Sequence, residues 1–249
     1  MNETLDAISG LGLVLRQKRA GHRVGLDAVL LTATASAGTA PRRIVDVGAG
    51  VGSVGLALAR RYAEAQVDLV EIDPELAALA AENAARNGLA GRARVVVADV
   101  ARPRERRAGG VEDGAADLVA TNPPFYLATA SRVSPDPARA RAHALNGADP
   151  LAVWLRASLA LLAPGGRFAM IHRPDALPAI YSALGRRLGE VVVRPVYPRA
   201  GEDAIRVLVA GVKGSRAPAR LAPPLVLHEA DGSATAEARA VHEGRGLWP

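Results

Sequence analysis

The sequence has no cysteine among its 249 residues. Disulfide bonds, thiolate metal sites and cysteine nucleophiles are therefore excluded. Its five histidines are scattered and form no pair with metal-ligand spacing, so we expect no bound metal. No apolar run approaches the roughly 20 residues that span a bilayer. The first residues, with Glu3 and Asp6, also lack a signal-peptide pattern, so we expect a cytoplasmic protein without a membrane partner.

Lysine and aromatic residues are scarce. Only Lys18 and Lys213 are lysine, so arginine supplies nearly all the positive charge behind the net charge of +6. Arginine makes bidentate contacts with phosphate, which is consistent with a nucleic-acid partner. Alanine and arginine are enriched along the whole chain, however, and a codon bias would have the same effect. Charge alone leaves this question open.

Length and composition are typical of one larger α/β domain, because 249 residues that are 49% hydrophobic can fill one core. We find no internal repeat and predict a single domain over residues 1–249. It would comprise an N-terminal arm and helix (1–43), a core (44–214) and a C-terminal extension without an assigned role (215–249).

Residues 44–52, Ile-Val-Asp-Val-Gly-Ala-Gly-Val-Gly, predict a buried strand that turns into a helix over 53–62. Gly48, Gly50 and Gly52 remove the Cβ atoms where the chain bends. The amino end of the helix would point at this bend, so a polar cofactor could bind exposed N–H groups there. Residues 50–55 also satisfy the dinucleotide fingerprint, and the glycines alone leave a nicotinamide or flavin site open.

Acidic residues follow the next two predicted strands. Glu71 lies near the end of a strand over 67–72, and Asp99 follows a strand over 93–98. An acid at the position of Glu71 can bind two ribose hydroxyls. Asp99 could accept a hydrogen bond from the exocyclic amine of an adenine. Each acid alone could be a helix cap or a solvated loop residue, but together with the glycines they predict one crevice.

A fourth strand over 116–121 leads directly into Asn122, Pro123, Pro124 and Phe125. The prolines stiffen the backbone, so the Asn122 amide and the Pro123 carbonyl can face a substrate as paired acceptors. Phe125 offers a face on which a planar group can stack. Two acceptors that hold the hydrogens of a planar amine favour methyl transfer to its nitrogen. The alternative is a rigid turn with a core phenylalanine.

The remaining segments complete an alternating pattern. Residues 11–19, after a polar start, could form an edge strand or a basic arm, and Asp27 is the expected N-cap of a helix over 28–37. Arg23 and Asp27 could form a cap and a surface ion pair, or close a flap over the cofactor. Further helices are expected over 75–87, 150–162 and 175–188, a helical turn within 102–114, and strands over 167–171, 191–196, 205–212 and 225–227.

These motifs resemble those of class I S-adenosylmethionine-dependent methyltransferases with an Asn-Pro-Pro-aromatic site. The resemblance rests on residues 45–50, Glu71, Asp99 and residues 122–125. More narrowly, residues 23–31 followed by this set resemble bacterial enzymes that methylate the N6 amine of an anticodon-adjacent adenine in valine tRNA. The resemblance covers residues 16–214. It implies a Rossmann-like, doubly wound sheet of seven strands, mostly parallel with an antiparallel last strand.

The resemblance also implies roles for individual residues. Asp46, Gly48 and Gly50 would surround the methionine part of S-adenosylmethionine, Glu71 the ribose and Asp99 the adenine. The catalytic set would be Asn122, Pro123 and Phe125. Phe125 stands where many relatives have tyrosine, so stacking would be kept and only a hydroxyl contact would be affected. The full expected cofactor set is Asp46, Gly48, Ala49, Gly50, Glu71, Ile72, Asp99, Val100 and Asn122.

The expected function is methyl transfer from S-adenosylmethionine to the N6 amine of adenine in RNA, with tRNA as the first candidate. A basic loop over 131–146, with Arg132, Arg139, Arg141 and His143, could contact RNA phosphates or be solvated. Enzymes acting on DNA adenine, guanine N2 of ribosomal RNA or protein glutamine share the motif and remain alternatives. A nicotinamide-dependent oxidoreductase would leave residues 122–125 unexplained, and a non-catalytic RNA-binding module would retain RNA without consuming the cofactor. We expect a monomer or weak homodimer.

Overall fold

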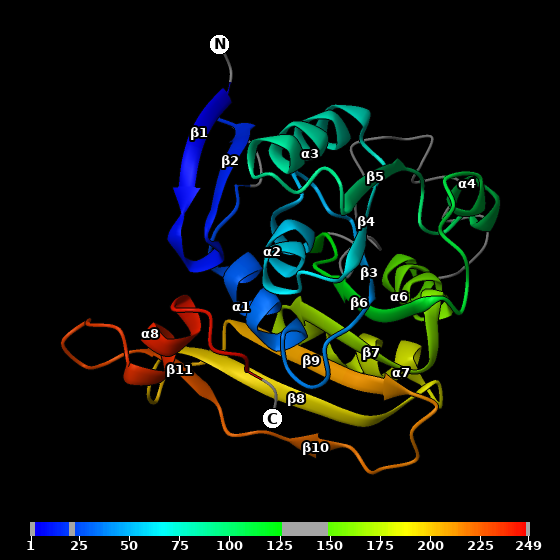
Figure 1. Cartoon of the computed structure of the whole chain (residues 1–249). Helices are drawn as coiled ribbons and strands as arrows, with labels where there is room; N and C mark the ends of the chain where they lie inside the picture. Colours follow the sequence, from blue (N-terminus) through cyan, green and yellow to red (C-terminus); the bar gives the residue numbers. More distant parts are fainter. Residues whose placement is uncertain (1–2, 20–22, 126–148, 248–249) are drawn as a thin grey trace.

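The computed structural model describes residues 3–19, 23–125 and 149–247 (Figure 1). A twisted sheet forms its centre, and β9 alone among the seven core strands runs antiparallel to its neighbours. This confirms the predicted class I topology. In spatial order the core strands are β8 (Leu188–Arg199), β9 (Arg206–Lys213), β7 (Leu162–His172), β6 (Ala116–Thr121), β3 (Arg43–Val47), β4 (Gln66–Glu71) and β5 (Ala93–Val97).

Helices cover both faces of the sheet, which explains why its central strands are almost continuously apolar. Ile44 of β3 packs in one core, and its neighbour Val45 packs in the other, as the alternation of a strand requires. The first core is covered by α1 (Leu26–Ala35), α2 (Ser53–Arg61) and α3 (Pro74–Arg86). The second is covered mainly by α6 (Pro150–Leu161) and α7 (Leu177–Leu184).

Side-chain caps mark where α3 and α6 begin. The Asp73 carboxylate accepts hydrogen bonds from the first turn of α3, and Asp149 accepts one from Leu151 N at 3.0 Å in α6. The predictions for α2, α3 and α6 agree with the structure within two residues. The prediction of a helix over 175–188 is too long, because a 3-10 turn (Pro174–Ala176) precedes α7 and Gly185, at φ 52°, ends it.

Residues 3–18 form a hairpin, so the start of the chain, which the sequence indicates only to be polar, contains a strand. Its strands are β1 (Glu3–Ile8) and β2 (Leu13–Lys18), and β2 packs against α3 (Figure 1). The fully buried Asn83 of α3 pairs with the backbone of Arg16, accepting from its N–H at 2.7 Å and donating to its carbonyl at 3.0 Å. The segment is therefore a separate two-stranded ribbon fixed to α3 and not a free basic arm.

The expected cap at Asp27 is also wrong. Gly25 occupies the N-cap position of α1, and Asp27 lies inside the first turn. Arg23 forms an ion pair with Asp6 at 3.1 Å, whereas Asp27 pairs with Arg206. The sequence alternatives for Arg23 and Asp27 therefore missed both of their actual partners.

The C-terminal extension packs onto this core. Two short strands, β10 (Arg220–Leu221) and β11 (Leu225–His228), pair with β8 in parallel, and β11 confirms the strand predicted over 225–227. Thr235 caps α8 (Ala236–His242), which lies against α1. The predicted helical turn after Asp99 is α4 (Pro103–Ala108). In the part of the chain that the structure describes, no helix could cross a membrane.

Candidate active site

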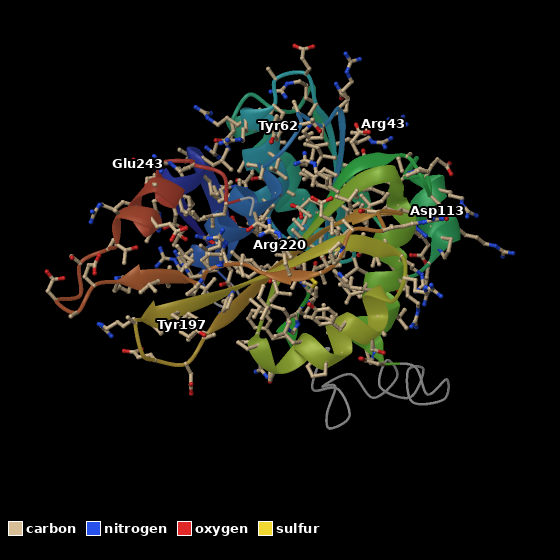
Figure 2. The ribbon with its side chains drawn as sticks, turned by 90° about the horizontal axis from the view of Figure 1, so that it is seen from below. Arg43, Tyr62, Asp113, Tyr197, Arg220 and Glu243 are labelled. Atoms are coloured by element: carbon tan, nitrogen blue, oxygen red, sulfur yellow. The ribbon has the colours of Figure 1, made fainter. Side chains whose placement is uncertain are left out.

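The carboxyl ends of β3, β4, β5 and β6 meet at one edge of the sheet, because these strands are parallel. The predicted site residues lie at or just after these four ends, so the structure brings them to one edge: the glycine-rich turn, Glu71, Asp99 and the Asn122 motif. Arg43 is the first residue of β3, and Tyr197 lies near the carboxyl end of β8. The two residues are on opposite sides of the molecule (Figure 2).

The glycine-rich turn uses left-handed backbone conformations. Gly48 and Gly50 have φ values of 71° and 57°, which a residue with a Cβ atom adopts only under strain. A Cβ atom at Gly48 would lie 2.8 Å from the ring of Trp154, whereas one at Gly50 would meet nothing within 4 Å. Gly48 is thus packed against Trp154 of α6, and the space beside Gly50 is open.

Glu71 holds this turn in place. Its Oε2 accepts a hydrogen bond from Gly50 N at 2.8 Å, and its Oε1 accepts one from Asp73 N at 2.9 Å. The side chain is nearly buried, with the residue 7% exposed. Each carboxylate oxygen has a second lone pair, so Glu71 can still accept hydrogen bonds from two hydroxyl groups.

Asp46 lies beneath the turn and anchors α2. Its Oδ2 accepts a hydrogen bond from Gly55 N at 2.7 Å. A Cβ atom at Gly55 would come within 2.2 Å of the Leu69 side chain, so only glycine allows α2 to approach the sheet this closely. The last glycine of the dinucleotide-like fingerprint therefore has a packing reason that involves no dinucleotide. Burial raises the pKa of Asp46 to about 7.

Asp46→Asn is expected to remove a pH dependence of stability. The folded protein keeps the Asp46 proton up to about pH 7, whereas the unfolded chain releases it near the ordinary pKa of 3.8. Wild-type stability should therefore fall, relative to the variant, by up to ~4 kcal/mol as the pH rises from about 4 to 7. Urea unfolding of both proteins across this range measures the difference. A difference that does not change with pH would contradict the buried, protonated state.

The β4 and β5 ends provide apolar surface beside these polar groups. Ile72 is 44% exposed directly after Glu71, while Val100 is buried. Asp99 Oδ1 accepts from Ala101 N at 2.9 Å, and Oδ2 lies 3.5 Å from Arg102 Nε. An exposed apolar side chain directly after Glu71 offers a surface to a flat heterocycle joined to a ribose.

Asn122 carries an unsatisfied group at the end of β6. Its Oδ1 is buried, and no residue in the described part of the chain donates a hydrogen bond to it. The preceding Thr121 is fixed, because its hydroxyl donates to Val47 O at 2.8 Å and accepts from Trp154 Nε1 at 2.9 Å. Leaving a buried acceptor unpaired costs about 1–3 kcal/mol. A ligand that donates to Asn122 would supply the missing bond.

Phe125 is half-buried, so the alternative of a core phenylalanine does not describe it. Its ring meets the ring of His172 edge to face, with centroids 5.2 Å apart, and the Arg206 guanidinium carbon lies 4.8 Å above its centroid. Sequence reasoning missed Trp154, His172 and Arg206. Only Trp154 gave a signal by its type, because aromatic residues form 3% of the chain.

Some sequence expectations are not resolved by this geometry. The basic loop over 131–146 lies outside the described residues. Within residues 3–19, 23–125 and 149–247, no group of three or more His, Asp or Glu side chains could hold a metal ion.

Comparison with known proteins identifies the family. Residues 25–136 match the methyltransferase small domain. A tRNA1(Val) (adenine(37)-N6)-methyltransferase of Aeromonas hydrophila is 34% identical over 218 residues, 86% of each chain. The chain belongs to the class I S-adenosylmethionine-dependent methyltransferases. A Porphyromonas gingivalis protein with the same name is 35% identical to this methyltransferase over 182 residues, 70% of this chain and 69% of that one.

Solved structures agree on the fold of this methyltransferase. A predicted O-methyltransferase of Agrobacterium tumefaciens is 32% identical, with a TM-score of 0.73 over 90% of this chain and 98% of that chain. A Thermus thermophilus 16S rRNA N2 methyltransferase, in complex with AdoMet and guanosine, is 20% identical, with a TM-score of 0.56 over 87% and 46% of the chains. The latter similarity concerns the fold alone.

The cofactor of this family, S-adenosylmethionine, fits the residues at the sheet edge. The open space beside Gly50, the spare lone pairs of Glu71 and the exposed Ile72 can take up a polar chain, a ribose and a base respectively. Membership of the family favours methyl transfer over the nicotinamide-dependent and non-catalytic alternatives.

Proposed function

We propose that this methyltransferase methylates the N6 amine of an adenine in RNA, and that the RNA is a tRNA. The buried Oδ1 of Asn122 carries the proposal, because no described residue donates a hydrogen bond to it. An exocyclic amine has two hydrogens, and one of them would satisfy this acceptor. The names of the relatives from Aeromonas hydrophila and Porphyromonas gingivalis support adenine in tRNA as the acceptor.

In the proposed reaction, Asn122 Oδ1 and the carbonyl of Pro123 accept the two hydrogens of the amine. When bound, S-adenosylmethionine would supply an electrophilic methyl group, and the electron pair of the broken carbon–sulfur bond would stay on its sulfur. The two acceptors hold the amine nitrogen in one orientation and favour the positive charge that develops on it. Phe125 stacks on the base and limits its rotation. The nitrogen releases its proton to solvent afterwards, so no strong general base is required.

Around the cofactor we assign roles as the family resemblance implies. The backbone of Gly48, Ala49 and Gly50 would contact the methionine part, and Glu71 would accept from the ribose hydroxyls. Asp46 would act by holding α2 and the turn, since its Oδ2 is bonded to Gly55 N and the residue is 2% exposed. The other expected members of this set are Ile72, Asp99 and Val100 beside the adenine, and Asn122 next to the acceptor.

Arginines near the acceptor edge have acidic neighbours. Arg199, at the end of β8, lies 3.4 Å from Glu202, and Arg173, just after β7, pairs with Asp175. Such exposed pairs contribute little to stability and separate readily. An RNA phosphate could therefore replace the carboxylate as the partner of each guanidinium.

Nucleoside analysis after labelling tests the proposal. The purified protein is incubated with methyl-labelled S-adenosylmethionine and separate pools of tRNA, ribosomal RNA, DNA and protein. We expect label in tRNA as N6-methyladenosine. Label on guanine, in DNA or in protein would keep the methyltransferase but overturn the proposed acceptor. If the protein bound S-adenosylmethionine but labelled none of the four pools, this would contradict the proposed methylation of RNA.

A further inference from the structure

The ring of Phe125 is held by side chains from two strands that lie far from it in the sequence. Arg206 is the first residue of β9, and His172 is the last residue of β7. Because β9 is antiparallel to β7, its first residue lies at the same edge as the last residue of β7. The topology of the sheet thus brings both side chains to the acceptor motif.

Asp27 fixes the position of the Arg206 guanidinium. Arg206 Nε lies 2.9 Å from Oδ1 and 3.1 Å from Oδ2 of Asp27, and its Nη1 donates to Ile205 O at 2.8 Å. The Asp27 and Arg206 side chains are 15% and 25% exposed, so solvent screens the pair less than a surface pair. A cation held over an aromatic face attracts it, and the attraction is stronger where the groups are shielded from water.

His172 supports the ring from a second direction. It is fully buried, and no residue in the described part of the chain hydrogen bonds to either ring nitrogen. Burial lowers the pKa of His172, so the imidazole packs against Phe125 in its neutral form. The charged groups that act on it are Arg173, Asp175 and Arg206.

We propose that Asp27, Arg206 and His172 form a clamp that fixes the ring of Phe125 in the orientation in which the acceptor base stacks. Asp27 and Arg206 are then positioning residues for methyl transfer, and the inference rests on the proposed role of Phe125 at the acceptor. Loss of the cation over the ring should raise the KM for the acceptor, or lower kcat, by roughly 5- to 30-fold. The Kd for S-adenosylmethionine should not change.

Fluorine NMR tests the clamp without any substrate. The chain has only two phenylalanines, Phe125 and the fully buried Phe168, so a protein labelled with 4-fluorophenylalanine gives one resonance for the clamp and one internal reference. We expect Asp27→Asn and Arg206→Gln each to shift or broaden the Phe125 resonance and to leave that of Phe168 in place. An unmoved Phe168 resonance also shows that the core remains folded.

The matched control is Arg94→Gln. Arg94 also forms an ion pair with an aspartate, Asp68, at 2.8 Å, but this pair is more exposed and lies near the start of β5, at the opposite edge of the sheet. This variant should change neither resonance. If Asp27→Asn and Arg206→Gln also leave the Phe125 resonance unchanged, the clamp does not exist.

Steady-state kinetics complete the test on whichever acceptor the wild-type protein labels. Asp27→Asn and Arg206→Gln should change the acceptor KM or kcat, and Arg206→Lys, which keeps a cation near the ring, should recover part of the loss. A shifted Phe125 resonance with wild-type kinetics would overturn the positioning role. If the wild-type protein labels no RNA, the proposed function fails, while the fluorine spectra still decide whether Asp27 and Arg206 hold the ring.

Discussion

Asn122→Ala is expected to lower kcat for RNA methylation by roughly 10²- to 10³-fold, the loss typical of removing one preorganised hydrogen-bonding group from an active site. The buried Oδ1 is in place before the substrate binds, and no described residue occupies it. Without it, the amine keeps only the Pro123 carbonyl and can rotate. Single-turnover methylation measures the loss, and calorimetry with S-adenosylmethionine separates it from the cofactor contact also expected of Asn122.

Asn122→Asp is the matched control. It has nearly the same shape and keeps an acceptor at the same place, so it should lose less activity than the alanine variant.

Thermal unfolding of Asn122→Ala adds an independent readout. An unpaired buried acceptor costs about 1–3 kcal/mol, so Asn122→Ala should be as stable as the wild-type protein or more stable. If Asn122→Ala kept activity within tenfold of the wild type, this would contradict the proposed role of Asn122.

The parts of the fold that sequence predicts well are those encoded by neighbouring residues. The β6 strand agrees with its predicted bounds of 116–121, because a buried apolar run ends at a proline pair that cannot continue it. The glycine-rich turn could also be predicted from its sequence. Gly48, Gly50 and Gly52 all adopt positive φ, a conformation that favours glycine. Motifs that follow neighbouring parallel strands must meet at one edge, so the common location of these residues could be predicted from their order.

The features that sequence reasoning missed depend on long-range contacts. Asp27 and Arg206 are 179 residues apart, and nothing local in either segment specifies the other. The β1 strand was missed for a related reason. Its burial pattern alternates between exposed and intermediate without a buried residue, so its ladder to β2, rather than an apolar face, identifies it. The packing role of Gly55 follows from the Leu69 side chain on a different strand.

Glu71→Ala is expected to raise the Kd for S-adenosylmethionine by roughly 10²- to 10³-fold. The carboxylate binds the backbone of both Gly50 and Asp73, so its removal leaves two N–H groups without their acceptor and releases the turn. Hydrogen bonds to a charged group contribute about 1.5–3 kcal/mol each, and the proposed ribose contacts are lost as well. Isothermal titration calorimetry of the purified protein measures the change.

Two variants make the Glu71 result specific. Glu71→Gln replaces one acceptor oxygen by an NH₂ group that would face a backbone N–H, so its affinity should fall between those of the wild type and Glu71→Ala. Glu75→Ala removes an acid that is nearby in the sequence, exposed and paired only with Lys18 among the described residues, and such a pair contributes about 0–1 kcal/mol. Its Kd should match the wild type. If Glu71→Ala bound the cofactor as well as Glu75→Ala does, the turn would hold its shape without Glu71, and the cofactor would have to be recognised by the glycine backbone alone.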